Sequence, residues 1–175
     1  MDKYILIKPD ISFKDDIQAF RKEMLDAGSS MDGTGPLRRM TTAEEWLNFI
    51  HLCQDKETVP ENWVTSDQFI YVRQGDKKIV GMIDFRHYFN EFLEKYGGNI
   101  GYSIRPSERK KGYGKRMLSE CLKVCKEYGL DKVLITCTKE NEASRRTILS
   151  NGGVYEKTVY CEPDDVYLER YWIHL

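Results

Sequence analysis

The chain has 175 residues, with 27 lysines and arginines against 28 aspartates and glutamates, and a formal net charge of -1. This length suits one hydrophobic core, so we expect a single domain over residues 1–175. The balanced charge argues against a general nucleic-acid-binding protein, although a local basic patch can still hold a small anion.

The five cysteines are odd in number and include no C-x-x-C pair. This pattern is typical of reduced thiols in a cytosolic protein and argues against a zinc site. The first ten residues lack a cationic segment followed by a long apolar run, and no apolar stretch is long enough to cross a bilayer. We therefore expect a cytoplasmic protein with no membrane partner, no nucleic-acid partner and no bound metal.

The first part of the chain predicts one strand and two helices. Residues 4–9 form a short apolar run that a proline ends, and apolar residues recur at helical spacing from Asp15 to Ala27. Thr41 or Thr42 can cap the second helix. The segment 28–40, rich in glycine, connects the two helices and is long enough to close over a site.

The middle of the chain predicts a hairpin, a strand and a long helix. Residues 68–89 alternate as two extended runs around a Gln-Gly-Asp turn. Residues 99–106 form a strand that Pro106 stops. Apolar residues then recur at helical spacing over 113–128, and Gly129 ends this helix.

The last part predicts a buried strand at 132–138, a short helix from Asn141 to Ser150, and two strands near 154–160 and 166–173. The order of elements predicts an α/β (α+β) fold, with a mixed, largely antiparallel sheet of about seven strands flanked by helices on both faces. The aromatic tail 167–175 is either a core strand or an exposed strand at the contact of a possible homodimer.

Two glycines and five basic residues surround the start of the 113–128 helix. Gly112 and Gly114 allow close approach of the backbone to a ligand, and the first N–H groups of a helix have no intrahelical acceptor. With the helix dipole, these donors favour an anion such as a phosphate. The alternative is a solvated basic helix start with glycine in a turn. Glu108 lies beside this segment, and we expect it to occupy a solvated loop position. Neither the P-loop nor the dinucleotide-binding pattern is present.

The segment Arg109-Lys110-Lys111-Gly112-Tyr113-Gly114 resembles the [RQ]-x-x-G-x-[GA] motif of the GNAT superfamily of N-acetyltransferases, and it lies between a strand and a long helix as in that family. Asn141-Glu142-Ala143-Ser144 is similar to the family's N-x-x-[AS] helix start. Asn151-Gly152-Gly153 lies where the family has a K-x-G-F ending. The detailed resemblance covers residues 98–156.

The resemblance implies an N-acetyltransferase that moves an acetyl group from acetyl-CoA (coenzyme A) to a small-molecule or peptide amine by direct attack in a ternary complex. It implies that the Ile104 N–H polarises the thioester carbonyl. Asn141 and Ser144 would contact the pantetheine arm, or they simply cap a helix. The implied cofactor-binding residues are Ile104, Arg109, Lys110, Lys111, Gly112, Tyr113, Gly114, Lys115, Asn141 and Ser144.

The chain departs from the family where acid and base chemistry is expected. Many members have a tyrosine seven residues after the asparagine, and this chain has Ile148; others have a carboxylate where this chain has residues 97–99. An attacking amine must lose a proton, so Asp84 and His87 are candidate bases, each with a structural role as the alternative. Among the tyrosines, Tyr155 is a candidate acid, alongside Tyr102, Tyr113 and Tyr160.

Residues of the 28–40 loop, among them Met31, Asp32 and Arg38, are expected to contact the acceptor, as is segment 161–166. The acidic residues of that segment either attract a cationic amine or form a solvated turn. No cysteine context demands a covalent acetyl-enzyme. The alternative function is a non-catalytic acyl-CoA-binding sensor or interaction domain, which the missing tyrosine favours. RNA binding is disfavoured because no strand carries an aromatic stacking pattern.

Overall fold

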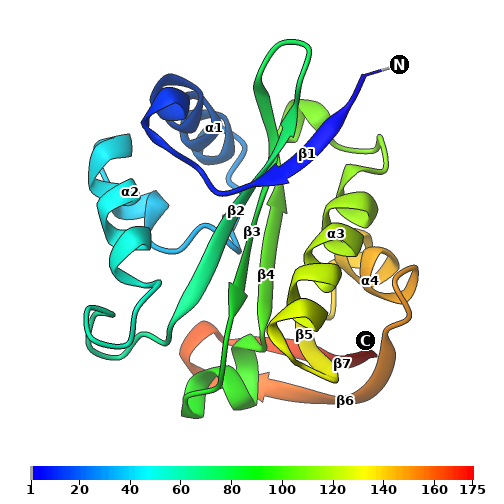
Figure 1. Cartoon of the computed structure of the whole chain (residues 1–175). Helices are drawn as coiled ribbons and strands as arrows, with labels where there is room; N and C mark the ends of the chain where they lie inside the picture. The colour runs from blue at the N-terminus through cyan, green and yellow to red at the C-terminus, as the bar shows by residue number, and fades with distance from the viewer. Residues whose placement is uncertain (1) are drawn as a thin grey trace.

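The computed structural model describes residues 2–175, and its elements follow the order predicted from the sequence (Figure 1). The strands are β1 (Tyr4–Ile7), β2 (Ser66–Arg73), β3 (Lys78–Arg86), β4 (Ile100–Ile104), β5 (Lys132–Thr138), β6 (Val154–Cys161) and β7 (Val166–His174). The α-helices are α1 (Lys14–Asp26), α2 (Ala43–Leu52), α3 (Tyr113–Tyr128) and α4 (Glu142–Leu149).

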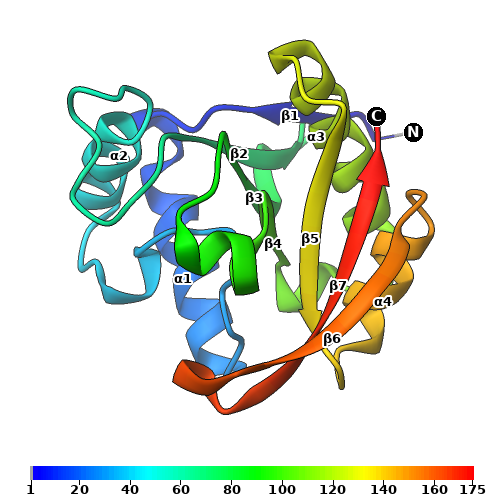
Figure 2. The same cartoon turned by 90° about the horizontal axis from the view of Figure 1, so that it is seen from below.

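The seven strands form two antiparallel ladders, in the orders β1-β2-β3-β4 and β5-β7-β6. Figure 1 shows α1 and α2 on one side of the first ladder and α3 on the other, and Figure 2 shows the second ladder from below. The predicted fold class, a largely antiparallel seven-stranded sheet with helices on both faces, is confirmed. The division into two ladders was not part of that prediction.

Two apolar clusters form the core, one on each face of the first ladder. The helices α1 and α2 each bury one apolar stripe against the sheet, as does α3. All five cysteines are buried and free. The cluster under α3 includes Met117, Leu118, Cys121 and Cys125, and the cluster under α1 and α2 includes Phe20, Met24 and Trp46.

The two ladders are joined at the start of β4 by Asn99. Its N–H donates to the carbonyl of Leu134 in β5 at 2.7 Å, and its Oδ1 accepts from the N–H of Leu134 at 2.9 Å. Its Nδ2 donates to the carbonyl of Arg86 at 3.2 Å. Gly98 has φ +67, and a Cβ there would lie 2.4 Å from the Leu134 oxygen. Beyond this junction β4 and β5 belong to separate ladders, so the strands diverge toward Ile104.

The loop between α1 and α2 packs directly on β4. A Cβ on Gly33, which has φ +74, would lie 2.1 Å from the carbonyl oxygen of Gly101. The hydroxyl of Ser103 donates to the carbonyl of Asp32 at 2.5 Å. The indole N–H of Trp46 donates to another loop carbonyl at 2.7 Å. The predicted long connection is therefore ordered and covers one face of β4.

Within residues 2–175, no helix has both the length and the apolar character needed to cross a membrane.

Candidate functional site

The free edge of β4 faces the region where β5 diverges. Alternate residues of an antiparallel strand bond to opposite sides. The N–H of Arg105 donates to the carbonyl of Val80 in β3 at 2.9 Å. The preceding residue, Ile104, therefore directs its N–H and carbonyl away from β3. This places the predicted Ile104 N–H donor in the opening between the two ladders.

The start of α3 is open to a ligand. Gly112 is the N-cap residue in the left-handed conformation, with φ +78, and no side chain caps the helix there. A Cβ on Gly112 would meet no atom within 4 Å. The N–H groups of the first turn therefore have no side-chain acceptor, and the Cβ position of Gly112 is open. These residues fit the pyrophosphate group of acetyl-CoA, because oriented N–H donors at a helix start favour an anion.

Arg109 connects the motif loop to two neighbouring segments. Its Nε donates to the carbonyl of Ile104 at 3.1 Å, and its Nη2 donates to the hydroxyl of Ser29 at 2.5 Å, just after α1. Lys110, Lys111 and Lys115 are all exposed, and the ammonium of Lys111 also contacts Glu108. The motif loop therefore combines an internally fixed arginine with lysines at the surface.

Tyr102 reaches from β4 to the start of α4. Its hydroxyl lies 2.7 Å from the hydroxyl of Ser144 and 3.2 Å from the carbonyl of the same residue. Burial raises the pKa of Tyr102 well above its ordinary value. The Oδ1 of Asn141 accepts the N–H of Ser144 at 3.1 Å, so Asn141 caps α4. Ile148, which replaces the family's tyrosine, is fully buried.

Asp84 lies on the opposite face of the sheet, toward the 28–40 loop. It is 6% exposed, and its Oδ1 accepts the N–H of Gly101 at 3.1 Å and lies 3.3 Å from Nη2 of Arg86. Burial raises the pKa of Asp84 and the charge of Asp32 adds to the rise, whereas Arg86 and the Gly101 N–H oppose it. The structure thus holds a buried carboxylate beside β4.

His87 and Tyr155 lie elsewhere. The Nε2 of His87 lies 2.9 Å from Asp67, and its ring stacks on Tyr128, the last residue of α3, at 4.5 Å between centroids. His87 therefore packs on the α3 side of the sheet, whereas Asp84 lies on the side of the 28–40 loop, so the two candidate bases have different environments. Tyr155 is 52% exposed on β6, and its hydroxyl bonds to Thr158 at 2.8 Å.

Sequence reasoning missed three residues that shape the site. Asn99 joins the ladders, Gly33 brings the loop onto β4, and Glu108 is 3% exposed, which corrects the expectation of a solvated residue. A lone acid just before a basic run was a signal for Glu108. The contacts of Asn99 and Gly33 depend on distant strands and have no local signal.

The model of the acetyltransferase (GNAT) family matches residues 39–152. No curated protein matches the chain. A GNAT-family acetyltransferase from Bacillus anthracis is 22% identical, with 99% of this chain and 98% of that chain covered and a TM-score of 0.67.

Two further similar structures contain the cosubstrate or its product. The acetyltransferase yncA from Salmonella typhimurium, with acetyl-CoA, is 14% identical over 98% of this chain and 94% of that one, with a TM-score of 0.68. RimL, a ribosomal L7/L12 α-N-protein acetyltransferase in complex with coenzyme A, is 17% identical with the same coverage and TM-score. These likenesses show the fold. Because the family model spans well over half of the residues, this chain belongs to the GNAT acetyltransferase family and is an acyltransferase that uses acetyl-CoA.

Proposed function

We propose that the protein transfers an acetyl group from acetyl-CoA to the nitrogen of a small-molecule or peptide amine by direct attack in a ternary complex. The observation that carries this proposal is the start of α3, which follows the edge strand β4 and has no side-chain cap and an open Cβ position at Gly112. The backbone of residues 110–114 would hold the pyrophosphate, as the resemblance to the family motif implies.

Ile104 supplies the donor for the reacting carbonyl. Bound acetyl-CoA supplies a thioester whose C–S bond breaks as the acceptor nitrogen forms the new C–N bond. The N–H of Ile104 would donate to the carbonyl oxygen as negative charge develops there. A donor of this kind contributes about 3 kcal/mol in other acyl-transfer enzymes.

Asp84 is the proposed general base, and Tyr102 is the proposed hydrogen-bond donor to the leaving group. Asp84 would accept the proton lost by the amine, directly or through water, and its raised pKa brings the base closer to neutral pH. Tyr102 lies on the same face of β4 as Ile104, and its hydroxyl stays protonated, so it would donate a hydrogen bond to the departing sulfur. No role is proposed for His87 or Tyr155.

The thiols support direct attack over a covalent acetyl-enzyme. All five are buried, and burial raises the pKa of both Cys53 and Cys137 to about 11. A thiol of that kind is almost entirely protonated at neutral pH, whereas the thiolate is the nucleophile. The acceptor amine is therefore the proposed nucleophile on the acetyl group.

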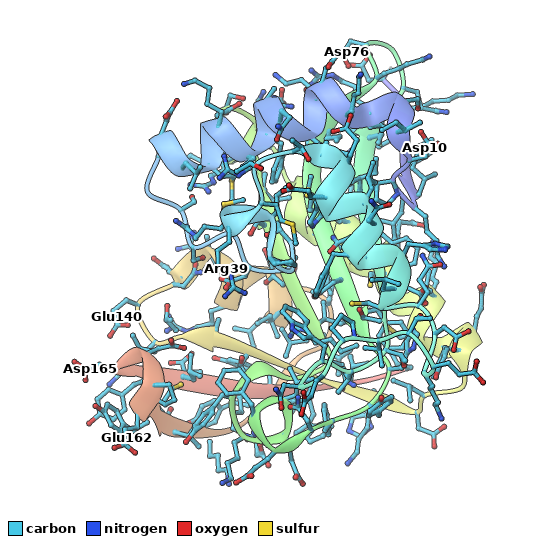
Figure 3. All side chains as sticks on the ribbon, turned by 90° about the vertical axis from the view of Figure 1, so that its left-hand side faces the viewer. Asp10, Arg39, Asp76, Glu140, Glu162 and Asp165 are labelled. Carbon is cyan, nitrogen blue, oxygen red and sulfur yellow. The ribbon has the colours of Figure 1, made fainter. Side chains whose placement is uncertain are left out.

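We propose that the acceptor enters between the 28–40 loop and the β6–β7 turn. Figure 3 shows Arg39 of the α1–α2 connection on the same side of the molecule as Glu140, Glu162 and Asp165. The carboxylates of Glu140, Glu162 and Asp165 would attract a cationic amine. Since RimL acts on a ribosomal protein by its name, the α-amino group of a protein is one candidate acceptor.

The test combines binding and turnover. Purified protein is melted with and without acetyl-CoA, and then incubated with acetyl-CoA and a panel of primary amines while free coenzyme A is measured. We expect stabilisation by about 2.7 kcal/mol at 100 times the dissociation constant, and amine-dependent release. Stabilisation without transfer to any amine would instead support the acyl-CoA sensor that Ile148 in place of tyrosine favours. No stabilisation would contradict both functions.

A further inference from the structure

Glu108 is a buried carboxylate directly before the motif loop. Its side chain is 4% exposed, yet it contacts three cations. Its Oε2 lies 3.1 Å from Arg73 at the end of β2 and 2.9 Å from Lys111 in the motif loop, and its Oε1 lies 3.2 Å from Lys78 at the start of β3. Glu108 therefore joins the motif loop to both strands of the β2–β3 hairpin.

The hairpin end of this network is itself fixed. Arg73 makes a two-pronged contact with Asp76 in the turn, with Nη2 to Oδ2 at 2.8 Å and Nε to Oδ1 at 3.0 Å. Burial alone would raise the pKa of Glu108, but hydrogen bonds from Lys111, Lys78 and Arg73 lower it to about 2. Glu108 is therefore charged at neutral pH and is anchored to a braced arginine.

Lys111 is held from two directions. Glu108 binds its ammonium, and Nη2 of Arg116 donates to its carbonyl at 3.2 Å. The Arg116 guanidinium lies over the rings of Tyr4 and Tyr113, at 5.3 and 5.0 Å from their centroids. The side chain and the backbone of Lys111 are thus both fixed.

The backbone just before Lys111 needs such support. Lys110 has φ +63 and Gly112 has φ +78. The left-handed conformation is unfavourable for a lysine and persists where surrounding contacts impose it. The contacts of Arg109 and of Lys111 flank Lys110 in the chain, and together they can impose this turn on the loop that leads into α3.

We propose that Glu108 is a positioning residue for the acetyl-CoA site, because it holds Lys111 against the hairpin and so keeps the N–H groups of residues 110–112 aimed at the pyrophosphate. This inference rests on the proposed function for the location of that group. Glu108 also draws the Lys111 ammonium away from the phosphates, which alone would weaken binding. The Lys111 side chain is 49% exposed and its charge is screened by water, so the geometric effect outweighs the electrostatic one.

The experiment compares Glu108→Gln with wild type and with Asp67→Asn. Asp67 is a matched control, since it pairs with Lys8 at 2.7 Å and His87 at 2.9 Å at the opposite end of β2. We expect Glu108→Gln to raise the KM and calorimetric Kd for acetyl-CoA about tenfold, as loss of supporting contacts does at other sites. On the same basis, we expect the kcat and the acceptor KM of Glu108→Gln to change less than about twofold. The acetyl-CoA Kd of the control Asp67→Asn should also change less than about twofold.

Lys111→Gln adds a second test, because the proposal makes Glu108 act through Lys111. The double variant Glu108→Gln, Lys111→Gln should bind acetyl-CoA no more weakly than the weaker single variant, since coupled residues are not additive. If Glu108→Gln does not fold, Glu108→Asp, which keeps the charge on a shorter arm, should show a smaller rise in the same Kd.

Three outcomes overturn the proposal: an unchanged or lowered acetyl-CoA Kd in the folded Glu108 variant, an equal rise in Asp67→Asn, or additive losses in the double variant. Calorimetry measures binding without turnover, which separates the two hypotheses. Wild-type protein that binds acetyl-CoA but acetylates no amine would contradict the proposed function, while the comparison of Glu108 variants would still decide this inference.

Discussion

The two faces of β4 use glycine in opposite ways. On the face toward α3, Gly112 leaves clear space, because a Cβ there would meet nothing within 4 Å. On the other face, Gly33 lets the 28–40 loop touch Gly101, where a Cβ would lie 2.1 Å from a carbonyl oxygen. Both glycines have positive φ. The difference teaches that a glycine in this conformation can adjoin open space or the backbone of another segment, and that only its surroundings decide which.

The largest expected effect tests the open face with Gly112→Asp and Gly112→Asn. Both residues tolerate φ +78 better than other side chains do, and both can cap α3. Only aspartate adds a negative charge where the pyrophosphate is proposed to bind. We expect its acetyl-CoA Kd to rise about 100-fold, through lost charge-assisted hydrogen bonds and repulsion, with a clearly smaller rise for asparagine. Equal Kd values for the two folded variants would show that no phosphate binds there.

The second prediction concerns the loop-covered face and Asp84→Asn. If Asp84 is the general base, kcat falls about 100-fold in the variant. In wild type, kcat falls as the pH drops through the raised pKa of Asp84, because the protonated carboxyl cannot accept a proton. Asp84→Asn should lose that limb of the pH–rate profile. If the variant keeps both the wild-type kcat and the acid limb of the pH–rate profile, Asp84 is not the general base.

The same substitution predicts a pH-dependent change in stability. The folded-state pKa of Asp84 is raised, so its contribution to stability is fully present below its ordinary pKa and is lost as the pH rises through the folded pKa. Asp84→Asn removes this loss. We expect thermal melts to show that the stability of the variant, relative to wild type, increases from acid toward neutral pH. A stability difference that does not change with pH would contradict this prediction.

Gly33→Ala tests the backbone contact itself. The new Cβ would clash with the Gly101 carbonyl and would impose φ +74 on an alanine. We expect a loss of about 2 kcal/mol or more in the free energy of unfolding, measured by denaturant titration. Gly28→Ala is the control, because Gly28 has a similar φ of +63 but no atom within 4 Å of its Cβ position. Equal losses in the two variants would mean that the loop does not press on β4.

The smallest effect separates two tyrosines. Tyr102→Phe removes the hydroxyl that reaches Ser144, and we expect kcat to fall about tenfold, near one hydrogen bond's contribution. Tyr155→Phe removes a hydroxyl on the exposed β6, and we expect its kcat to match wild type. Turnover at saturating acetyl-CoA measures both. A fall with Tyr155→Phe alone would exchange the roles of the two residues.

The order of elements could be predicted from the sequence because its signals are local. The apolar stripe of α3 and its terminal Gly129, and the turn between β2 and β3, each lie within a few residues of the structure they specify. The motif loop was predictable for the same reason, since its glycines and basic residues adjoin the helix start.

The parts that could not be predicted depend on distant partners. Asn99 contacts Leu134, Gly33 contacts Gly101, and Glu108 contacts Arg73, each across at least 35 positions of the chain. Periodicity does not report such separations. Likewise, His87 lies just beyond the end of β3, so the strand pattern did not predict on which side of the sheet its ring lies. Its stacking on Tyr128 places the ring on the α3 side. The sequence therefore allowed more detailed predictions for the acetyl-CoA site than for the acceptor site.

Because every native thiol is buried, the folded protein should react slowly with sulfhydryl reagents. A cysteine introduced at an exposed position such as Lys110 would then be the fast-reacting group, so a fluorescent label could be attached beside the motif loop without removing any native residue from the core. In the unmodified chain, the rate of reaction with the same reagents would report how often α3 separates from the sheet, because this separation exposes Cys121 and Cys125.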